Sequence, residues 1–294
     1  MTNIITAAVG IINAYKNKKV FSTNKGAYGT SINNWGAYLE DFIAAAFSGS
    51  LLINDIKKRQ ELKEKAFCYS GSQNLPPDLM LRNGGPAIEV KKHASDTGGL
   101  SLNSSPPRQT LRKEDKRIAS AARTAEYWEE RKIIYAIGTI PGSNNIIKSI
   151  QLVYGDCFAA SHEFYDKVEG IIREQLEGAG SESPVEKYEG NELGRMNAVD
   201  PLKATYLRVR GMWEIKNPLR IFKEEGIADY SLSKGFTLLA MAKKAEFGKL
   251  SKESPEALAK LKTYADIKDI KIINPDNTAQ RLDAVLIKYV GDNQ

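Results

Sequence analysis

Two carboxylates and one ammonium group stand close together in the stretch PPDLMLRNGGPAIEVKK, residues 76–92. Asp78 is followed by ten residues and then by Glu-Val-Lys at 89–91. On a β-strand, residues two apart project from the same face, so Glu89 and Lys91 share a face. The Asn-Gly-Gly sequence at 83–85 favours a tight turn, and the resulting hairpin brings Asp78 beside Glu89.

This pattern predicts a particular chemistry. Two carboxylates held close together are costly unless a cation lies between them. Mg²⁺ suits the position because it prefers oxygen ligands and commonly uses one or two carboxylates. A metal held by Asp78 and Glu89 activates water and polarises a phosphodiester, while Lys91 orients the nucleophile and neutralises developing charge. The alternative is an exposed hairpin that carries an ordinary Glu/Lys pair.

Other polar residues are weaker candidates. Glu40, in YLEDFIAAAF, either faces the site and holds a water near the metal, or faces solvent on an amphipathic helix. His93 and His162 are the two histidines of the chain, so a histidine-dominated metal site or a Ser-His-Asp arrangement is disfavoured. Cys68 and Cys157 are too few for a disulfide framework, which favours a reducing cytoplasm.

The elements that must position these residues follow from hydrophobic periodicity and turn residues. Helices are expected near 2–16, 35–47 (capped by Asn34), 115–130, 161–177 and 251–264. Strands are expected at 66–70, 78–82, 87–92, 132–140, 149–158, 205–215, 271–275 and 281–290, with a polar loop at 95–109. Strands and helices alternate, which favours an α/β layer architecture.

Length and charge narrow the class of protein. The chain has 294 residues, of which 42% are hydrophobic, enough for the core of one large domain. No window approaches the roughly 18 apolar residues of a membrane span, so no membrane is expected as a partner. The net charge of +6 suits a polyanion, and basic residues gather at 108–117 and 207–211. Each basic cluster, taken alone, also fits a solvated surface.

Several blocks follow one another along the chain: NLPPDLMLRNGGPAIEVKK, LSLNSSPPRQTL, YWEERKIIYAIG, LVYGDCFAA and ELGRMNAVDPLKATYLRVRGMWEIKNP. Together they resemble the NgoPII-type family of type II restriction endonucleases, and this resemblance extends over most of the chain. It implies a PD-(D/E)XK fold, a mixed central β-sheet flanked by α-helices, with additional C-terminal strands and a helix. It also implies that Asp78, Glu89 and Lys91 take the nuclease positions and that Glu40 is the acidic helix residue.

The function implied by the resemblance is Mg²⁺-dependent cleavage of unmethylated double-stranded DNA at a short palindrome such as GGCC. A cognate DNA methyltransferase is then the genetic partner, and a two-fold target is most simply matched by a homodimer. We expect one domain over 1–294, with a catalytic core at about 34–177 and a DNA-recognition elaboration at about 178–294. A structure-selective repair nuclease and a non-catalytic DNA-binding protein are the alternatives.

Two segments supply residues able to contact DNA. The segment after the hairpin, 101–113, carries hydroxyls and amides, and arginines that pair bidentately with guanine; the segment 194–213 places arginines two apart on a strand. Either segment is otherwise an unliganded surface. The DNA-binding candidates are Asn103, Ser104, Ser105, Arg108, Arg112, Lys113, Arg195, Asn197, Arg208 and Arg210.

Overall fold

The computed structural model describes residues 2–17, 32–71, 75–95, 98–141, 146–179, 185–186, 192–227 and 235–291. Its helices are α1 (Ile4–Lys16), α2 (Ile32–Phe47), α3 (Ile56–Ala66), α4 (Ser120–Thr124), α5 (His162–Ala179), α6 (Pro218–Glu224), α7 (Lys244–Glu253) and α8 (Pro255–Lys262), with one 3₁₀ turn at Gly155–Cys157. Its strands are β1 (Phe67–Ser70), β2 (Leu79–Leu81), β3 (Ala87–His93), β4 (Leu100–Asn103), β5 (Thr110–Arg112), β6 (Glu130–Thr139), β7 (Ser149–Tyr154), β8 (Val185–Glu186), β9 (Glu192–Met196), β10 (Leu207–Arg210), β11 (Trp213–Ile215), β12 (Thr237–Lys243), β13 (Asp266–Asn274) and β14 (Asn277–Val290).

A mixed sheet forms the centre of the molecule. Within the described ranges it runs in the order β1-β2-β3-β6-β7-β12-β14-β13, and β5 adds to β6. The β3–β6 and β12–β7 pairs are parallel and the other pairs are antiparallel. β7 is buried along its whole length, as expected for a central strand covered on both faces. The predicted mixed central sheet with flanking helices is confirmed.

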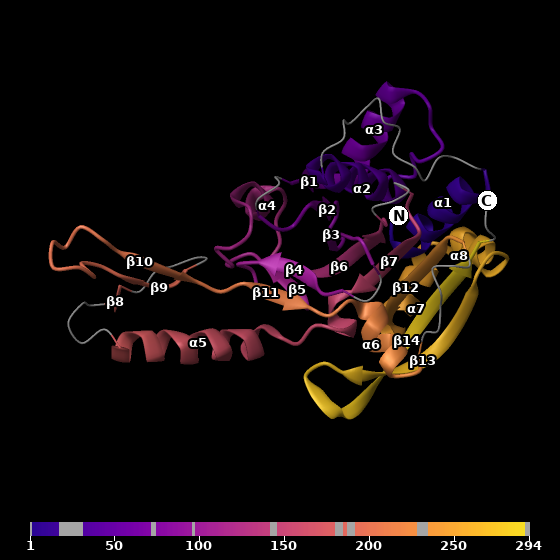
Figure 1. Ribbon diagram of the computed structural model, residues 1–294. Helices are drawn as coiled ribbons and strands as arrows, with labels where there is room; N and C mark the ends of the chain where they lie inside the picture. Colours follow the sequence, from indigo (N-terminus) through magenta and orange to yellow (C-terminus); the bar gives the residue numbers. More distant parts are fainter. Residues whose placement is uncertain are drawn as a thin grey trace.

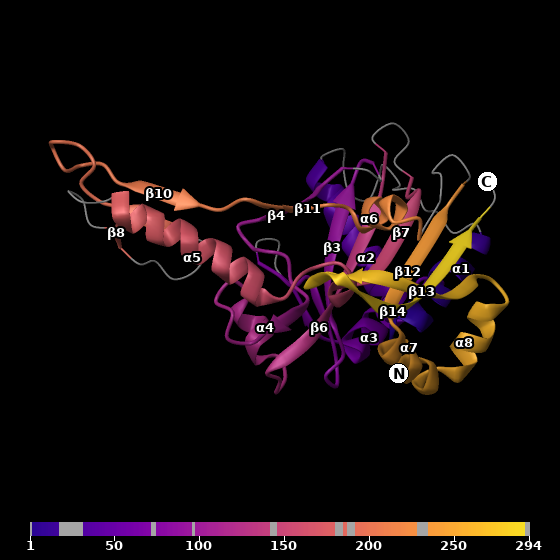
Figure 2. The same cartoon turned by 90° about the horizontal axis from the view of Figure 1, so that it is seen from below.

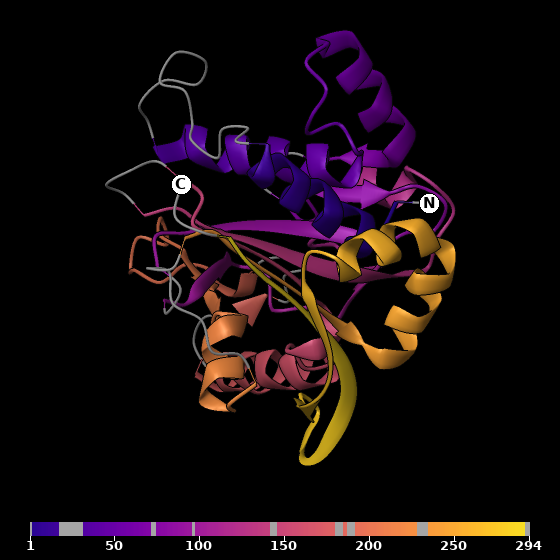
Figure 3. The same ribbon diagram turned by 90° about the vertical axis from the view of Figure 1, so that its right-hand side faces the viewer.

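Helices lie on both sides of the sheet. α1, α2 and α3 lie on one side, and α5 and α6 lie on the other (Figure 3). Leu39 of α2 packs where Gly138 of β6 leaves room for it, so this glycine sets how closely helix and sheet approach. Over the described residues, no helix has the length and apolar character needed to cross a lipid bilayer.

The first helix is tied to a distant part of the chain. Asn3 caps α1 in a capping box with Thr6, and its side-chain amide donates to the Leu250 carbonyl and to Ser254 Oγ (2.9 Å). α1 is buried on nearly all sides, with most of its residues at or below a tenth of full exposure. The N-terminal and C-terminal helices therefore belong to one core.

An arm projects from this body. It consists of α5 and the strands β8, β9 and β10, which form a separate small sheet in the order β10-β9-β8 (Figures 1 and 2). Beyond β10 the chain returns to the body through β11, which pairs with β4. We call α5 and β8–β10 the arm below.

Several predicted boundaries were wrong. The helix expected at 115–130 is only α4, because the following residues turn so that Trp128 buries its ring and donates to the Ala122 carbonyl (3.1 Å). The strand expected at 205–215 is two strands that join different sheets. The helix expected at 251–264 is the end of α7 and then α8, which restarts at Pro255, a residue suited to a first turn.

Two further differences concern the N-terminal part of α2 and the segment after the hairpin. α2 begins at Ile32, so Asn34 lies inside the helix and is not its cap. The polar loop expected at 95–109 contains β4, whose leucines alternate inward. The division of the domain near residue 177 stays a prediction, and the sheet crosses it: β12 from the expected elaboration pairs with β7 from the expected core.

Candidate active site

The hairpin that carries the nuclease-like pattern forms as expected. β2 and β3 pair antiparallel with Leu79 opposite Ile88. Asn83 and Gly84 both adopt positive φ, as a two-residue turn of the favoured hairpin type requires. Asp78 extends this pairing, since its N–H donates to the Ile88 carbonyl (3.1 Å). The turn therefore fixes which residue of β3 faces Asp78.

The three predicted residues converge. Asp78 Oδ2 accepts from the Val90 N–H at 2.6 Å, which holds this carboxylate across β3. Glu89 is buried, and its Oε1 pairs with Lys91 Nζ at 2.7 Å. Glu89 Oε2 is buried and has no hydrogen-bond partner. A polar oxygen without a hydrogen-bond partner is costly to bury, so this atom points to a ligand.

Electrostatics support the same interpretation. Burial, and then the nearby Glu89 carboxylate, raise the pKa of Asp78. Burial and Glu89 likewise raise the pKa of Glu40, although Lys91 opposes this. Burial alone lowers the pKa of Lys91, but the three surrounding carboxylates raise it, so the net shift is upward. Three acids thus crowd one lysine, and Glu40 lies within the electrostatic reach of the site.

A pocket opens on these groups. A cavity of about 240 Å³ is lined by Asp78, Glu89 and Lys91, together with residues from β4, the segment after it, β6 and β10. The additional lining residues include Asn103, Ser104, Ser105, Arg108, Tyr135 and Arg210. Asp78 also borders a second cavity that Glu40 lines, so this carboxylate lies between the two spaces.

The donor set fits a hard divalent cation. Among the described residues, no group of three or more His, Cys, Asp and Glu side chains is arranged to hold a metal ion. Mg²⁺, however, commonly takes only one or two carboxylates and keeps water for its other positions. Asp78 and Glu89, with the unpartnered Oε2, supply those two carboxylates. The fit rests on the chemistry of this pair.

Replacing Asp78 by Asn is expected to stabilise the metal-free protein. Its raised pKa means that the ionised carboxyl disfavours the folded state at neutral pH, and an amide oxygen still accepts from Val90. We expect a gain of about 1 kcal/mol, or roughly 2–4 °C in melting temperature. Thermal unfolding with chelator and then with Mg²⁺ measures this. A melting temperature below that of wild type in chelator would contradict the expectation, and Mg²⁺ should stabilise the variant less than wild type.

Comparison with known proteins decides the family. The profile described as NgoPII restriction endonuclease matches residues 2–273. The chain belongs to the NgoPII restriction endonuclease family. Consistent with this, it is 38% identical over 287 residues to the Type II restriction enzyme NgoPII of Neisseria gonorrhoeae, covering 98% of this chain and 99% of the relative. No solved structure matches the chain.

Five of the predicted DNA-binding residues line the pocket. Asn103 at the end of β4, and Ser104 and Ser105 just after it, lie along the pocket rim, and Arg210 reaches the pocket from the arm. The side chain of Arg108 is 4% exposed, and its guanidinium pairs with Asp115 (2.9 Å). The expectation that Arg108 reads guanine stays untested, but in this structure its guanidinium supports the segment that lines the pocket.

The remaining candidates lie away from Asp78, Glu89 and Lys91. Arg112 pairs with Glu163 at 3.0 Å, and Lys113 lies 3.8 Å from Glu129. In the arm, Arg208 sits opposite Arg195 across the β10–β9 pair. Asn197 directly follows β9. These arginines therefore extend the basic surface from the pocket rim along the arm.

Sequence reasoning missed the carboxylates that organise these arginines. Arg208 and Arg210 both pair with the buried Glu192 of β9, the latter at 3.2 Å. This contact forms because β9 and β10 pair, which places Arg210 opposite Glu192. Residues this far apart in the sequence carry little sign that they will meet. A strand pattern around Glu192 was the only available signal.

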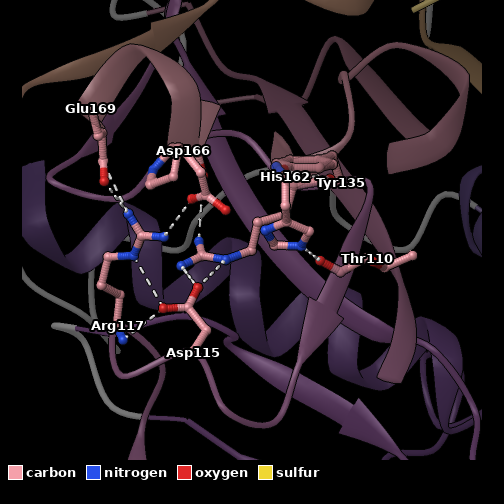
Figure 4. A network of polar contacts seen from close by, with 9 residues as sticks. Thr110, Asp115, Arg117, Tyr135, His162, Asp166 and Glu169 are labelled. Carbon is pink, nitrogen blue, oxygen red and sulfur yellow. Dashed lines mark hydrogen bonds and ion pairs between the residues drawn. The ribbon is translucent and has the colours of Figure 1, made fainter. Parts of the chain in front are cut away.

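A second missed feature joins the arm to the pocket. Asp115 binds both Arg108 and Arg117, and Arg117 binds Glu169 of α5 at 3.0 Å (Figure 4). The Arg108 N–H in turn donates to the hydroxyl of Tyr135, which lines the cavity. The cluster at 108–117 was read as a basic patch, yet its acid Asp115 makes it an internal support.

Proposed function

We propose that this restriction endonuclease cleaves both strands of duplex DNA with Mg²⁺ as its cofactor, using the pocket at Asp78, Glu89 and Lys91. The observation that carries the proposal is the buried, unpartnered Glu89 Oε2 beside a lysine and a second carboxylate. Bound there, the cation supplies charge for the scissile phosphate and a more acidic water. Asp78 and Glu89 are the residues that would hold it.

The protein groups each have a task in this scheme. Lys91, protonated next to Glu89, donates hydrogen bonds to a phosphate oxygen and neutralises charge that develops there. Glu40 orients water on the α2 side of the site. Its raised pKa means that it takes up a proton closer to neutral pH than an ordinary glutamate does. The Val90 N–H fixes the rotamer of Asp78, so this carboxylate is positioned before DNA arrives.

DNA recognition is assigned to the pocket rim and the arm. Asn103, Ser104 and Ser105 lie beside the catalytic groups, where hydroxyls and amides reach phosphates or base edges. Arg195, Arg208 and Arg210 continue from there along β9 and β10. Pairing with Glu192 holds two of these guanidiniums in place, which reduces the entropy lost on binding.

The finer parts of the proposal concern specificity and assembly. We assign a short palindrome, with GGCC as the first site to test, a homodimer that places one pocket on each strand, and a methyltransferase that protects the same site. The compartment is the reducing cytoplasm, in keeping with two unpaired cysteines, Cys68 and Cys157.

Digestion of DNA of known sequence tests the function directly. Purified protein with Mg²⁺ is expected to give discrete fragments from unmethylated plasmid, and sequencing of the ends gives the site and cut position. Chelator should abolish cleavage. A preference for branched or damaged DNA would favour a repair nuclease, and binding without cleavage under every divalent cation tried would favour a non-catalytic DNA-binding protein.

Replacing Arg208 by Ala is expected to weaken DNA binding about equally for specific and nonspecific duplexes. Its guanidinium is half exposed on the arm, as expected for a phosphate contact. The slope of log affinity against log salt should become shallower by about 1. Arg220→Ala, on α6 and paired with Glu224, removes the same charge outside the arm and should leave that slope unchanged. Equal slopes for wild type and Arg208→Ala would exclude this phosphate contact.

A further inference from the structure

The arm helix α5 presents its polar face to the protein and its apolar face to solvent. Arg173 donates to the Leu193 carbonyl (3.1 Å), Glu169 is buried against Arg117, and His162 contacts the Thr110 carbonyl. On the opposite side lies an apolar stripe with large exposed fractions: Phe164 50%, Val168 45%, Ile171 51% and Ile172 37%. This inverts the usual arrangement of an amphipathic surface helix.

The exposed apolar surface is concentrated in this part of the molecule. Most of the large hydrophobic side chains that the described residues expose lie between Phe164 and Met212. The arm also stands away from the body, so neither sheet face nor core helix covers the stripe (Figures 1 and 2). Contiguous exposed apolar residues on a soluble protein mark an interaction surface.

The spacing of the stripe fits a two-helix seam. Phe164, Val168 and Ile171 are separated by four and then three residues, the alternation of core positions in a coiled coil. Lys167 directly precedes the core residue Val168 and so lies beside the seam. Glu174, seven residues later, lies on the same side of the seam. Both side chains are exposed, and neither has an ion-pair partner in the part of the chain that the structure describes.

We propose that the α5 stripe pairs antiparallel with α5 of a second copy of this chain, forming an isologous dimer interface. In an antiparallel helix pair, equivalent flanks face each other, so Lys167 of each copy meets Glu174 of the other. Val168 of each copy then packs against Ile171 of the other, and the two-fold axis passes between these two contacts. A parallel pair would instead place Lys167 against Ile172, without charge complementarity. The flanking charges therefore select both the partner and the orientation.

This interface rests on the proposed function, because cleavage of both DNA strands requires two active sites. The Glu169–Arg117–Asp115–Arg108 connection ties the inner face of α5 to the pocket-lining segment (Figure 4). Pairing on the outer face thus joins two pockets through rigid, ion-paired supports. A single helix pair is smaller than the roughly 800 Å² per partner of standard interfaces, so a micromolar dimer is expected.

Sedimentation analysis between about 1 and 100 μM tests the interface, since small interfaces dissociate in this range. The wild-type chain should show a monomer–dimer equilibrium. Ile171→Glu places a charge in the seam of both copies and should shift the protein to monomer. Lys167→Glu and Glu174→Lys should each raise the dissociation constant on the order of tenfold, because attraction becomes repulsion at two symmetric places. The double variant Lys167→Glu/Glu174→Lys should recover near wild-type association.

Controls separate this proposal from unfolding and from the proposed function. Lys249→Glu makes the same charge change on α7 and should leave association unchanged. Circular dichroism checks that each variant folds, which is expected because the substituted side chains are exposed. A monomer throughout the range, a dimer insensitive to every α5 variant, or a double variant that fails to recover would overturn the interface. A dimer that behaves as described but cuts no DNA would refute the proposed function and leave the interface standing.

Discussion

Replacing Lys91 by Ala is expected to lower the rate of DNA cleavage by about 10³-fold or more, with DNA affinity changed less than about threefold. Lys91 Nζ lies 2.7 Å from Glu89 Oε1 in the pocket, and the surrounding carboxylates keep it protonated. Its positive charge stabilises the negative charge that develops in the transition state more than it stabilises bound, uncut DNA. Single-turnover cleavage and a gel-shift assay with Ca²⁺ in place of Mg²⁺ separate the two effects.

Lys92→Ala is the matched control for this prediction. Lys92 is the next residue of β3 and projects from the other face of the sheet, so the same charge is removed away from the pocket. It should retain cleavage within a few-fold of wild type. Undiminished cleavage by Lys91→Ala would rule out the assigned role. An equal loss in both variants would mean that misfolding or the loss of any positive charge on β3 explains the effect.

Replacing Asp115 by Ala is expected to destabilise the protein by about 3–5 kcal/mol. The change leaves the buried side chain of Arg108, which is 4% exposed, without its acidic partner, and also removes the link from Arg117 to the pocket segment. An uncompensated buried charge is far more costly than the loss of a surface pair. Urea unfolding at neutral pH gives the free energy.

Asp166→Asn is the control for the Asp115 variant. Asp166 also approaches Arg117, at 3.8 Å, but its side chain is 57% exposed. Solvent screens such a pair, so the expected cost is below about 1 kcal/mol. Similar losses from both substitutions would mean that burial does not govern this network.

The contribution of Asp115 to stability should also appear as a loss of folding free energy at low pH. Burial opposes ionisation of Asp115, but Arg108 and Arg117 outweigh it and lower the pKa from 3.8 to about 2. A depressed carboxyl pKa stabilises the folded state above the unfolded value, and this contribution is lost as pH falls through the folded value. About 2 kcal/mol should therefore disappear between about pH 4 and pH 2. The Asp115→Ala variant should lack this component of the pH dependence.

The local parts of the fold were predictable from sequence. Alternating apolar residues and the Asn83-Gly84 turn defined the β2–β3 hairpin, and the long apolar runs of β6 and β7 identified buried strands. The return of β12 to β7 across more than eighty residues depends on tertiary packing, which periodicity does not encode. For the same reason, β10 and β11, which join different sheets, were predicted as one strand.

The three residues proposed to be catalytic come together for a physical reason. Asp78, Glu89 and Lys91 lie within one hairpin, so strand geometry alone brings them together. The support of Arg108 by Asp115 and of the arm arginines by Glu192 depends on which charged group ends up buried. A sequence shows charges but not their burial, so these arginines appeared free for DNA.

The bonds from Asn3 to Leu250 and Ser254 bear on how the chain matures during synthesis. Translation at roughly 5–20 residues per second leaves α1 waiting at least about ten seconds for the segment that covers it. Meanwhile α2 and the β2–β3 hairpin have already been made. The contacts of α1 with α7 and α8 therefore form only near the end of synthesis, long after α1 itself.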